Sequence, residues 1–129
     1  MRKITHVFTA PILAVLLIVC SGCGAVIVGG LSAAGTYVYL DGQSEATYDA
    51  SLSRAYKASL RACKDLGIPV TTQTMDGASA KVEGKLSGDT VILSLKLVGD
   101  GLTQITVRVG LLGNENQSRR IHNAIKKHL

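Results

Sequence analysis

The sequence contains no tryptophan, and aromatic residues make up only 4% of it. Surfaces that bind nucleic acid combine a clustered stripe of lysine and arginine with aromatic side chains on which bases stack. The formal net charge is +5, and it falls to +3 if Arg2 and Lys3 leave with an N-terminal signal, since each carries one positive charge. We therefore predict no nucleic-acid partner. The mild basic excess that remains suits an anionic lipid surface or an acidic polymer.

The N-terminal apolar run is too short for a membrane-spanning helix, which needs roughly 20 apolar residues. Residues from Thr9 to Val19 are apolar or small throughout, and Pro11 within them removes a helical hydrogen-bond donor. Two basic residues near the N-terminus precede this run. A positive segment followed by a short apolar one is typical of a signal peptide, which we predict over residues 1–22.

Two small residues, Ser21 and Gly22, stand directly before Cys23, and this arrangement resembles the cleavage site of a bacterial lipoprotein. The resemblance implies that Cys23 becomes the mature N-terminus and carries a diacylglycerol and an N-acyl chain. At about 0.8 kcal/mol per buried methylene, two or three such chains anchor a protein effectively permanently. Two alternatives stay open. One is lipidation of Cys20, which the bulky Val19 before it disfavours, and the other is an ordinary signal peptide or an uncleaved anchor.

The segment after the predicted anchor carries no charge over residues 24–40. Gly24 is not the aspartate that resembles an inner-membrane retention signal, so we expect the outer membrane, facing the periplasm, in a host with two membranes. We predict that residues 23–43 comprise the lipidated cysteine and an apolar Gly/Ala-rich tether, with Tyr37 and Tyr39 at the lipid interface. The alternative is self-association or insertion through residues 24–40, because their small side chains let helices approach closely.

One cysteine, Cys63, remains if Cys20 is discarded and Cys23 is modified. A disulfide needs two thiols, so we predict none in the mature chain. Cys63 lies within a helical apolar pattern, and free cysteine is among the most buried residue types. We therefore predict a buried apolar cysteine rather than a reactive thiol.

A helical period of three to four residues begins after a turn cluster. Apolar or small residues recur at this spacing from Tyr48 to Leu66, which predicts an amphipathic helix. Ser44 or Thr47 is the expected N-cap of this helix. Gly67 is the expected left-handed residue that ends it.

Four strand-like runs follow, each alternating apolar and polar residues, with short turn signals between them. Short turns make neighbouring strands antiparallel. A last helix, with Asn114 and Gln117 as a capping box, follows the strands. The predicted fold over residues 44–129 is α+β: a four-stranded antiparallel meander sheet with an N-terminal and a C-terminal helix packed on one face, in the order α-β-β-β-β-α. The runs are Ile68–Thr74, Ala80–Leu86, Val91–Leu97 and Thr103–Val109.

The two faces of the predicted sheet differ in chemistry. The helices are expected to cover the apolar face, which carries Val82, Val91, Leu93, Leu95, Ile105 and Val107. The other face is polar with a basic tilt, and it carries Lys81, Glu83, Lys85, Ile92, Ser94, Lys96, Gln104, Thr106 and Arg108. We hypothesise that this face docks an acidic envelope partner, with Lys85, Lys96 and Arg108 supplying charge that steers association. The alternative is a face that is only solvated, as is common in antiparallel sheets.

Chemically active motifs are scarce. His122 and His128 are six residues apart, which places them on different sides of the last helix, and no cysteine or carboxylate has metal-ligand spacing with them. We interpret both as solvated or helix-end histidines, and we predict no metal, no cofactor and no catalytic residue. The alternative is an envelope hydrolase whose site is assembled from scattered residues.

Most of the chain after residue 22 resembles an uncharacterised family of small bacterial lipoproteins, defined as a domain of unknown function. The blocks that carry the resemblance are Gly22–Val26, Ala46–Leu52, Val107–Asn114 and Ser118–Ile121. The resemblance implies an envelope location and a helix, sheet, helix order, but no activity. We therefore expect a lipid-anchored binding or structural protein of the cell envelope.

Overall fold

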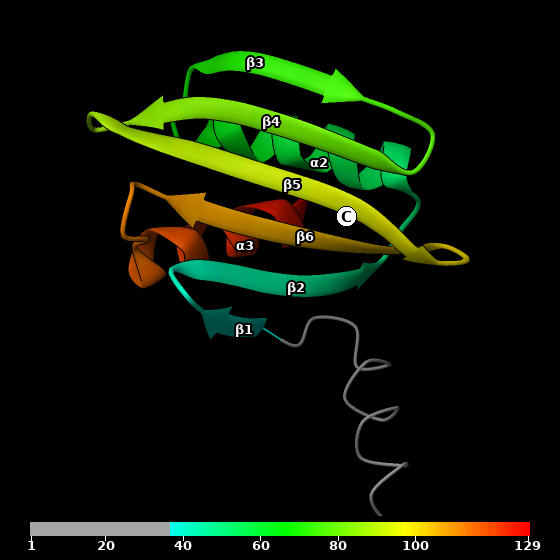
Figure 1. Cartoon of the computed structure of the whole chain (residues 1–129). Helices are drawn as coiled ribbons and strands as arrows, with labels where there is room; N and C mark the ends of the chain where they lie inside the picture. Colours follow the sequence, from blue (N-terminus) through cyan, green and yellow to red (C-terminus); the bar gives the residue numbers. More distant parts are fainter. Residues whose placement is uncertain (1–36) are drawn as a thin grey trace, which may run out of the picture. The chain divides into compact units, whose positions relative to one another are not determined.

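Six strands pair into one antiparallel sheet in the order β1-β2-β6-β5-β4-β3, accompanied by two helices, α2 and α3 (Figure 1). The computed structural model describes residues 37–129. The predicted signal peptide, Cys23 and residues 24–36 of the predicted tether lie outside the described residues. The elements are β1 Tyr37–Leu40, β2 Gln43–Asp49, α2 Leu52–Asp65, β3 Val70–Met75, β4 Ser79–Leu86, β5 Asp89–Gly99, β6 Leu102–Val109 and α3 Glu115–Lys127.

The prediction of a four-stranded sheet was wrong, because β1 and β2 extend the meander beyond β6. The meander itself was predicted correctly, since β3, β4, β5 and β6 pair consecutively. In β2 the buried residues Ser44, Ala46 and Tyr48 alternate with more exposed ones, which is the period of a strand. β1 joins β2 through Asp41 and Gly42, which both have positive φ, as a two-residue hairpin turn requires.

Helix α2 starts later than predicted, because the residues before it belong to β2. Its N-cap is Ser51, whose side chain accepts a hydrogen bond from the backbone N–H of Arg54. Neither Ser44 nor Thr47 caps it, since both lie in β2. The Ser51 hydroxyl satisfies one of the N–H groups that have no partner inside a helix.

The end of α2 is as predicted, with Gly67 in the left-handed conformation at φ +68°. Its N–H donates to the carbonyl of Lys64, and the N–H of Ile68 donates to that of Cys63. These two bonds form the Schellman arrangement, in which the residue after the glycine packs back onto the helix. Ile68 is accordingly buried in the core.

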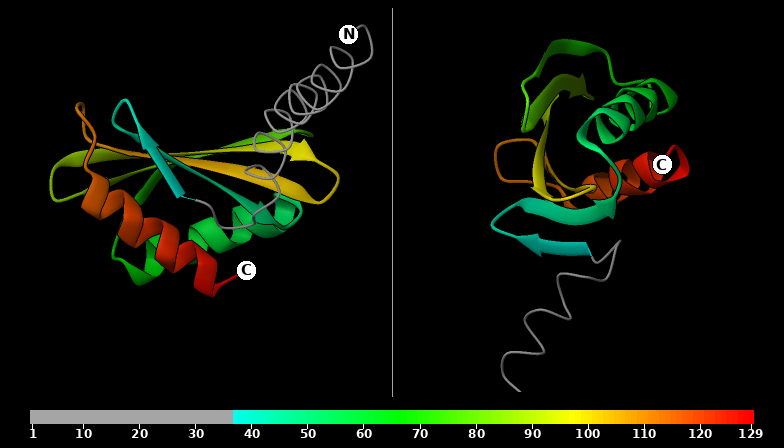
Figure 2. Two further views of the ribbon diagram at one scale, coloured as in Figure 1. Left: turned by 90° about the horizontal axis from the view of Figure 1, so that it is seen from below. Right: turned by 90° about the vertical axis from the view of Figure 1, so that its right-hand side faces the viewer.

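Both helices lie on the same side of the sheet (Figure 2). The two helices pack against each other, and on the sheet α2 lies mainly on β4 and β5 while α3 lies on β6 and β2. We call the side that they cover the inner face and the opposite side the outer face. Neither described helix is long and apolar enough to cross a bilayer.

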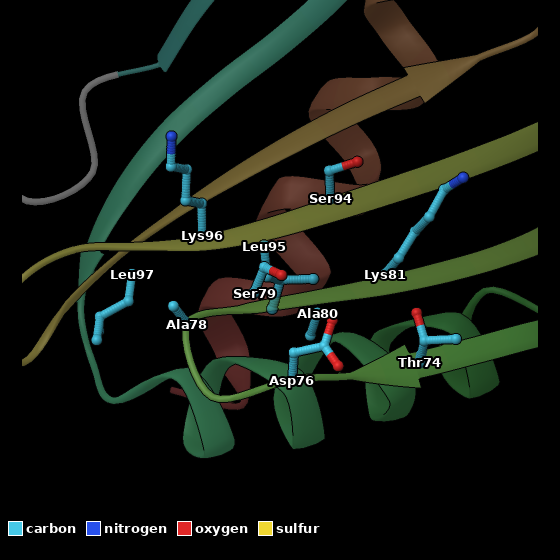
Figure 3. Close-up of a pocket in the computed structure, with 10 residues that line it drawn as sticks. All are labelled: Thr74, Asp76, Ala78, Ser79, Ala80, Lys81, Ser94, Leu95, Lys96 and Leu97. Atoms are coloured by element: carbon cyan, nitrogen blue, oxygen red, sulfur yellow. The ribbon is translucent and has the colours of Figure 1, made fainter.

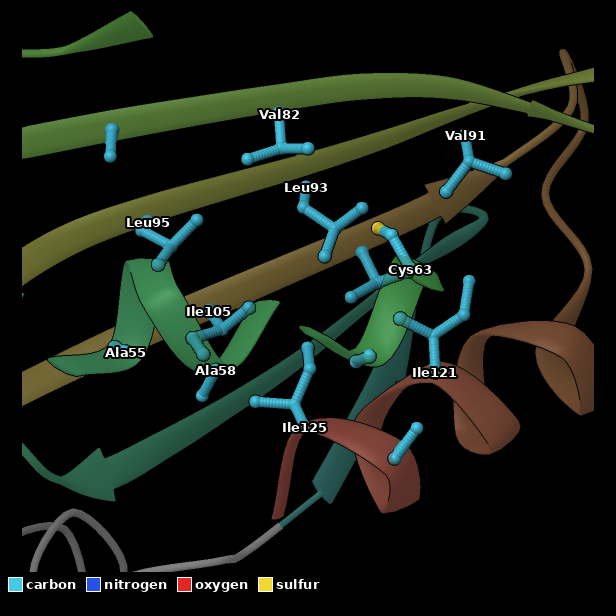
Figure 4. Packing of buried hydrophobic residues seen from close by; sticks show 14 of the residues in the cluster. Ala55, Ala58, Cys63, Val82, Val91, Leu93, Leu95, Ile105, Ile121 and Ile125 are labelled. Atoms are coloured by element: carbon cyan, nitrogen blue, oxygen red, sulfur yellow. The ribbon is translucent and has the colours of Figure 1, made fainter. Parts of the chain in front are cut away.

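The core lies between the inner face and the helices (Figure 4). Leu93 and Leu95 of β5 and Ile121 and Ile125 of α3 all belong to this core, and all four side chains are fully buried. The predicted apolar face is confirmed, because its six residues are all inaccessible to solvent. The prediction for Cys63 is confirmed as well: it is buried in this core, and burial raises the pKa of its thiol to about 11.

Candidate binding surface

The outer face gathers polar side chains from several of the described strands. Cross-strand pairing sets its rows, because directly opposed residues point to the same side of a sheet. One row pairs Glu83, Ile92 and Arg108, and the next pairs Lys81, Ser94 and Thr106. Most of the polar side chains that were predicted for this face are exposed or half-buried.

The three predicted partner-binding residues share the outer face but do not converge. Lys85 lies near the end of β4, opposite Thr90 of β5. Arg108 lies opposite Ile92, while Lys96 lies four residues further along β5, a separation of about 13 Å. Lys85 and Lys96 are exposed, and Arg108 is half-buried. Any partner that touches all three must therefore lie along much of the length of the sheet.

Arg108 has a partner within its own domain. Its guanidinium group donates a hydrogen bond to the carbonyl of Leu111, in the loop between β6 and α3. Sequence spacing gave no signal for this contact, because Leu111 follows the end of the strand. The two lysines are thus the more accessible cations of the predicted set.

A shallow hollow lies on the outer face where β4 and β5 run beside the β3–β4 turn (Figure 3). Its volume is about 600 Å³, and Lys81, Ser94 and Lys96 project from its lining strands. Lys81 pairs with Glu83 at 2.5 Å, while Lys96 has no ion pair among the described residues. Asp76, at the β3–β4 turn, also lines the hollow, so its charges are mixed. Lys96 and the hydroxyl of Ser94 are the groups there that are suited to a carboxylate or another anionic group.

The β2 side of the outer face is different, because its acidic group is engaged with neighbouring polar side chains. The carboxylate of Glu45 accepts hydrogen bonds from the Gln104 amide at 3.0 Å and from the Thr106 hydroxyl at 3.5 Å. β2 itself contains no lysine or arginine, so this side lacks the exposed cations that mark β4 and β5.

His122 of α3 is buried, so the prediction of a solvated histidine was wrong for this residue. It is only 3% exposed and packs against β2. Its Nδ1 lies 2.9 Å from the Tyr48 hydroxyl, and its Nε2 lies 3.2 Å from the carbonyl oxygen of Ser44. A carbonyl can only accept, so Nε2 carries the proton and Nδ1 accepts from Tyr48. Both ring nitrogens are therefore occupied inside the domain.

Burial keeps this pair neutral at physiological pH. It lowers the pKa of His122 to about 4, an effect that the hydrogen bond to Ser44 partly offsets. Burial also raises the pKa of Tyr48 to about 12. The sequence held one weak signal for this contact, since His122 falls three residues before the apolar Ile125, and residues at this spacing share one side of a helix.

A smaller cavity of about 240 Å³ adjoins His122 between α3 and the β1–β2 hairpin. Tyr37 lies edge-on to the imidazole with 5.4 Å between ring centroids, so it packs against α3. Its predicted place at the lipid interface stays a prediction. The Arg119 guanidinium lies 5.7 Å from the centre of the Tyr37 ring, and Lys126 also lines the cavity. The cavity is thus small and bordered by cations.

His128 behaves as predicted, as the C-cap of α3. Its Nε2 lies 2.6 Å from a carboxylate oxygen of Asp65, near the end of α2, so it ties the two helices together. Within residues 37–129 no cluster of three or more histidine, cysteine or acidic side chains could hold a metal ion.

Comparisons with known proteins add a family but no activity. The comparison with curated proteins found no match. The sequence profile of a family described as "Protein of unknown function (DUF3568)" matches residues 6–128, nearly the whole chain. This confirms the predicted membership of an uncharacterised family. The chain therefore belongs to the DUF3568 family of proteins of unknown function.

Proposed function

We propose that this protein is a lipid-anchored protein of the cell envelope, and that the outer face of its domain binds an acidic partner. The observation that carries the binding role is the placement of both helices. They cover the inner face, so within residues 37–129 no helix shields the polar outer face. Antiparallel sheets often leave one side in water. Here that side also carries a hollow lined by Lys81 and Lys96, together with Asp76.

The charges of the outer face support an acidic partner more than a neutral one. Lys85 and Lys96 are exposed, and Lys96 lies at the hollow. Exposed cations of this kind raise the rate of association with an oppositely charged surface more than they add affinity. Arg108 contributes positive charge to the same face, although its guanidinium already bonds to Leu111.

The proposed role is non-enzymatic, and the state of the buried titratable groups supports it. General acid–base catalysis needs groups that reach a substrate. His122 and Tyr48 have strongly shifted pKa values, yet they bond to each other and to the backbone, and the cavity that they line is small, at about 240 Å³. Their arrangement suits packing of α3 on β2.

The anchor rests on Ser21 and Gly22 before Cys23. Mass spectrometry of the protein purified from its native membrane tests it directly. We expect the mature chain to begin at Cys23 and to carry acyl chains. A mature form with an unmodified Cys23 would refute the anchor, and Cys23→Ser should abolish membrane attachment.

The binding surface is tested by crosslinking the native lipoprotein in its own membrane and identifying the captured partners. The variant is Lys85→Glu combined with Lys96→Glu, and the matched control is Lys57→Glu combined with Lys64→Glu. The control reverses the same charge on the exposed side of α2, away from the sheet. We expect the first pair to lose the captured partner and the control to keep it. Unchanged crosslinks in the first pair would rule out the outer face.

Arg108 is tested separately because its substitution also removes the bond to Leu111. Arg108→Lys keeps the charge and Arg108→Gln removes it. If charge alone matters, the lysine variant retains the crosslinked partner and the glutamine variant weakens it. Loss in both variants would assign Arg108 to holding the loop rather than to binding.

A further inference from the structure

The loop between β6 and α3 holds two leucines out of the domain. Leu111 is 85% exposed and Leu112 is 89% exposed, although both are large apolar side chains. Leu40, at the end of β1, is 69% exposed at the same end of the sheet, on the left of Figure 1. We call Leu111 and Leu112 the leucine tip.

Backbone contacts fix the leucine tip in this position. Gly42, in the β1–β2 turn, lies so close to the loop that a Cβ there would stand 2.5 Å from the Leu112 carbonyl oxygen. A Cβ on Gly113 would stand 2.2 Å from the carbonyl oxygen of Gly42. Glycine at both positions therefore lets two loops meet backbone to backbone. The Arg108 guanidinium also bonds to the Leu111 carbonyl.

The exposure of the tip thus has a structural cause, and nothing in the described domain covers it. Leu111 and Leu112 have no place in the core, which closes without them. Two apolar side chains that project from a loop can enter a fluid apolar layer more easily than they can pack on the rigid surface of a folded protein. A lipid bilayer is such a layer, with its apolar region beginning just beneath the headgroups.

The chain between Cys23 and β1 is long enough for the leucine tip to reach the membrane that holds the proposed anchor. Residues 24–36 span at most about 45 Å when extended. From the start of β1, its residues run about 10 Å toward the end of the sheet that carries the tip. A domain tethered at Cys23 can therefore bring the leucine tip to the surface that holds the anchor.

The charges around the tip set no preference for anionic lipid. Asp41 and Asp89 lie at this end of the sheet, as do Lys85 and Arg108. Contact with lipid should then depend on the two leucines and only weakly on salt, because screening acts on charges and leaves apolar burial in place.

We propose that the leucine tip inserts into the lipid surface that carries the anchor and so orients the domain on the membrane. This rests on the anchored location proposed above. The outer face then stands at a fixed angle to the membrane, with its β5–β6 end directed away from the lipid. The orientation presents the hollow near Lys96 to partners at a distance from the bilayer.

The absence of tryptophan from the chain gives a clean test. The full lipoprotein is reconstituted into phosphatidylethanolamine and phosphatidylglycerol vesicles, with or without brominated acyl chains that quench tryptophan. The reporter is Leu112→Trp, with Leu111→Trp as a second reporter. The control is Val98→Trp, an exposed residue of β5 at the opposite end of the sheet. Circular dichroism verifies that each variant is folded.

We expect several-fold stronger quenching at position 112 than at position 98, little changed by added salt. Equal weak quenching at both positions, with the protein still floating with the vesicles, overturns the leucine tip and leaves the anchor intact. Equal strong quenching also overturns it, because the domain would then lie flat. A blue-shifted emission at position 112 that grows with protein concentration and needs no vesicles would indicate a second copy instead.

The same measurement separates this proposal from the anchor. If mass spectrometry finds Cys23 unmodified and the protein does not float with vesicles, the anchor fails. Quenching at position 112 on adding vesicles would then keep the leucine tip as an independent lipid contact. If Cys23 is unmodified and position 112 shows no quenching, both the anchor and the leucine tip are overturned.

Discussion

The β6–α3 loop and helix α3, which follows it, both reverse the usual pattern in which polar side chains are exposed and apolar ones are buried. His122 of α3 is polar and 3% exposed, whereas Leu112 of the loop is apolar and 89% exposed. The histidine is explained from within the domain, because Tyr48 and Ser44 satisfy both of its ring nitrogens. The leucine is held outward by backbone contacts, but its side chain lies outside the core of the described domain.

This comparison separates His122, which stabilises the packing of the domain, from Leu112, whose side chain is available for contact outside the domain. A buried polar group with all its hydrogen bonds made fixes how two elements pack, and it is costly only when a partner is removed. An exposed apolar side chain held in place by backbone contacts gains nothing from the domain itself. We therefore expect substitutions at His122 to change stability and substitutions at the leucine tip to leave it unchanged.

The largest effect should come from His122→Ala. It leaves the Tyr48 hydroxyl and the Ser44 carbonyl without their partner and opens a cavity between α3 and β2. Each unpaired buried group costs about 1 to 3 kcal/mol, so the free energy of unfolding should fall by about 3 kcal/mol or more. His128→Ala is the control, with an expected loss of at most about 1 kcal/mol at an exposed helix end. Urea unfolding measures both, and similar losses would contradict the comparison.

Acid should reproduce much of this effect in the unaltered protein. The pKa of His122 is about 4 when folded, against 6.5 for an ordinary histidine. Between these values the unfolded chain binds more protons than the folded one, so stability falls as the pH falls. At 1.36 kcal/mol per pH unit, the loss is about 3 kcal/mol, complete near pH 4. Unfolding curves from neutral to about pH 4 measure the loss, and NMR titration assigns it. Titration of the His122 imidazole itself near pH 6.5 would show that His122 is not buried.

Tyr48→Phe should have a smaller effect, because it removes one bond and little volume. His122 Nδ1 is then left without a donor, and the expected loss is about 1 to 2 kcal/mol. The variant should also change the NMR signals of the imidazole. Adding His122→Leu to Tyr48→Phe should cost less than the sum of the single losses, since neighbouring sites couple. Strictly additive losses would mean that the two side chains do not interact.

The sequence predicted the meander and its inner face because β4, β5 and β6 alternate strongly between residues such as Leu93 and Ser94. It did not predict β2 as a strand, since the inward residues there are serine, alanine and tyrosine, which are weakly apolar and also fit a helical period through Tyr48. The pairing of β2 with β6 joins residues far apart in the sequence, such as Ala46 and Ile105. Local periodicity carries no information about such a partner.

For the candidate site residues, too, the sequence predicted which face a strand residue lies on but not which contacts it makes. Alternation placed Lys85, Lys96 and Arg108 on one face, but the bond from Arg108 to Leu111 depends on how the loop folds back. His122 was interpreted as a surface residue because polarity alone predicts exposure. Only the position of Tyr48 in β2 shows which partner makes its burial possible.

The smallest effect on stability should come from the leucine tip. Leu111→Ser combined with Leu112→Ser removes two large apolar side chains that make no core contact, and it keeps Gly113 and the backbone bonds of the loop. Exposed substitutions of this kind usually change the free energy of unfolding by less than about 0.5 kcal/mol. Gly113→Ala is the contrasting variant, because its Cβ would meet the Gly42 backbone at 2.2 Å and one loop must move. Urea unfolding should therefore separate a neutral double serine variant from a destabilised alanine variant. A double serine variant as unstable as His122→Ala would mean that the leucines hold the domain together, and that their exposure needs no external contact.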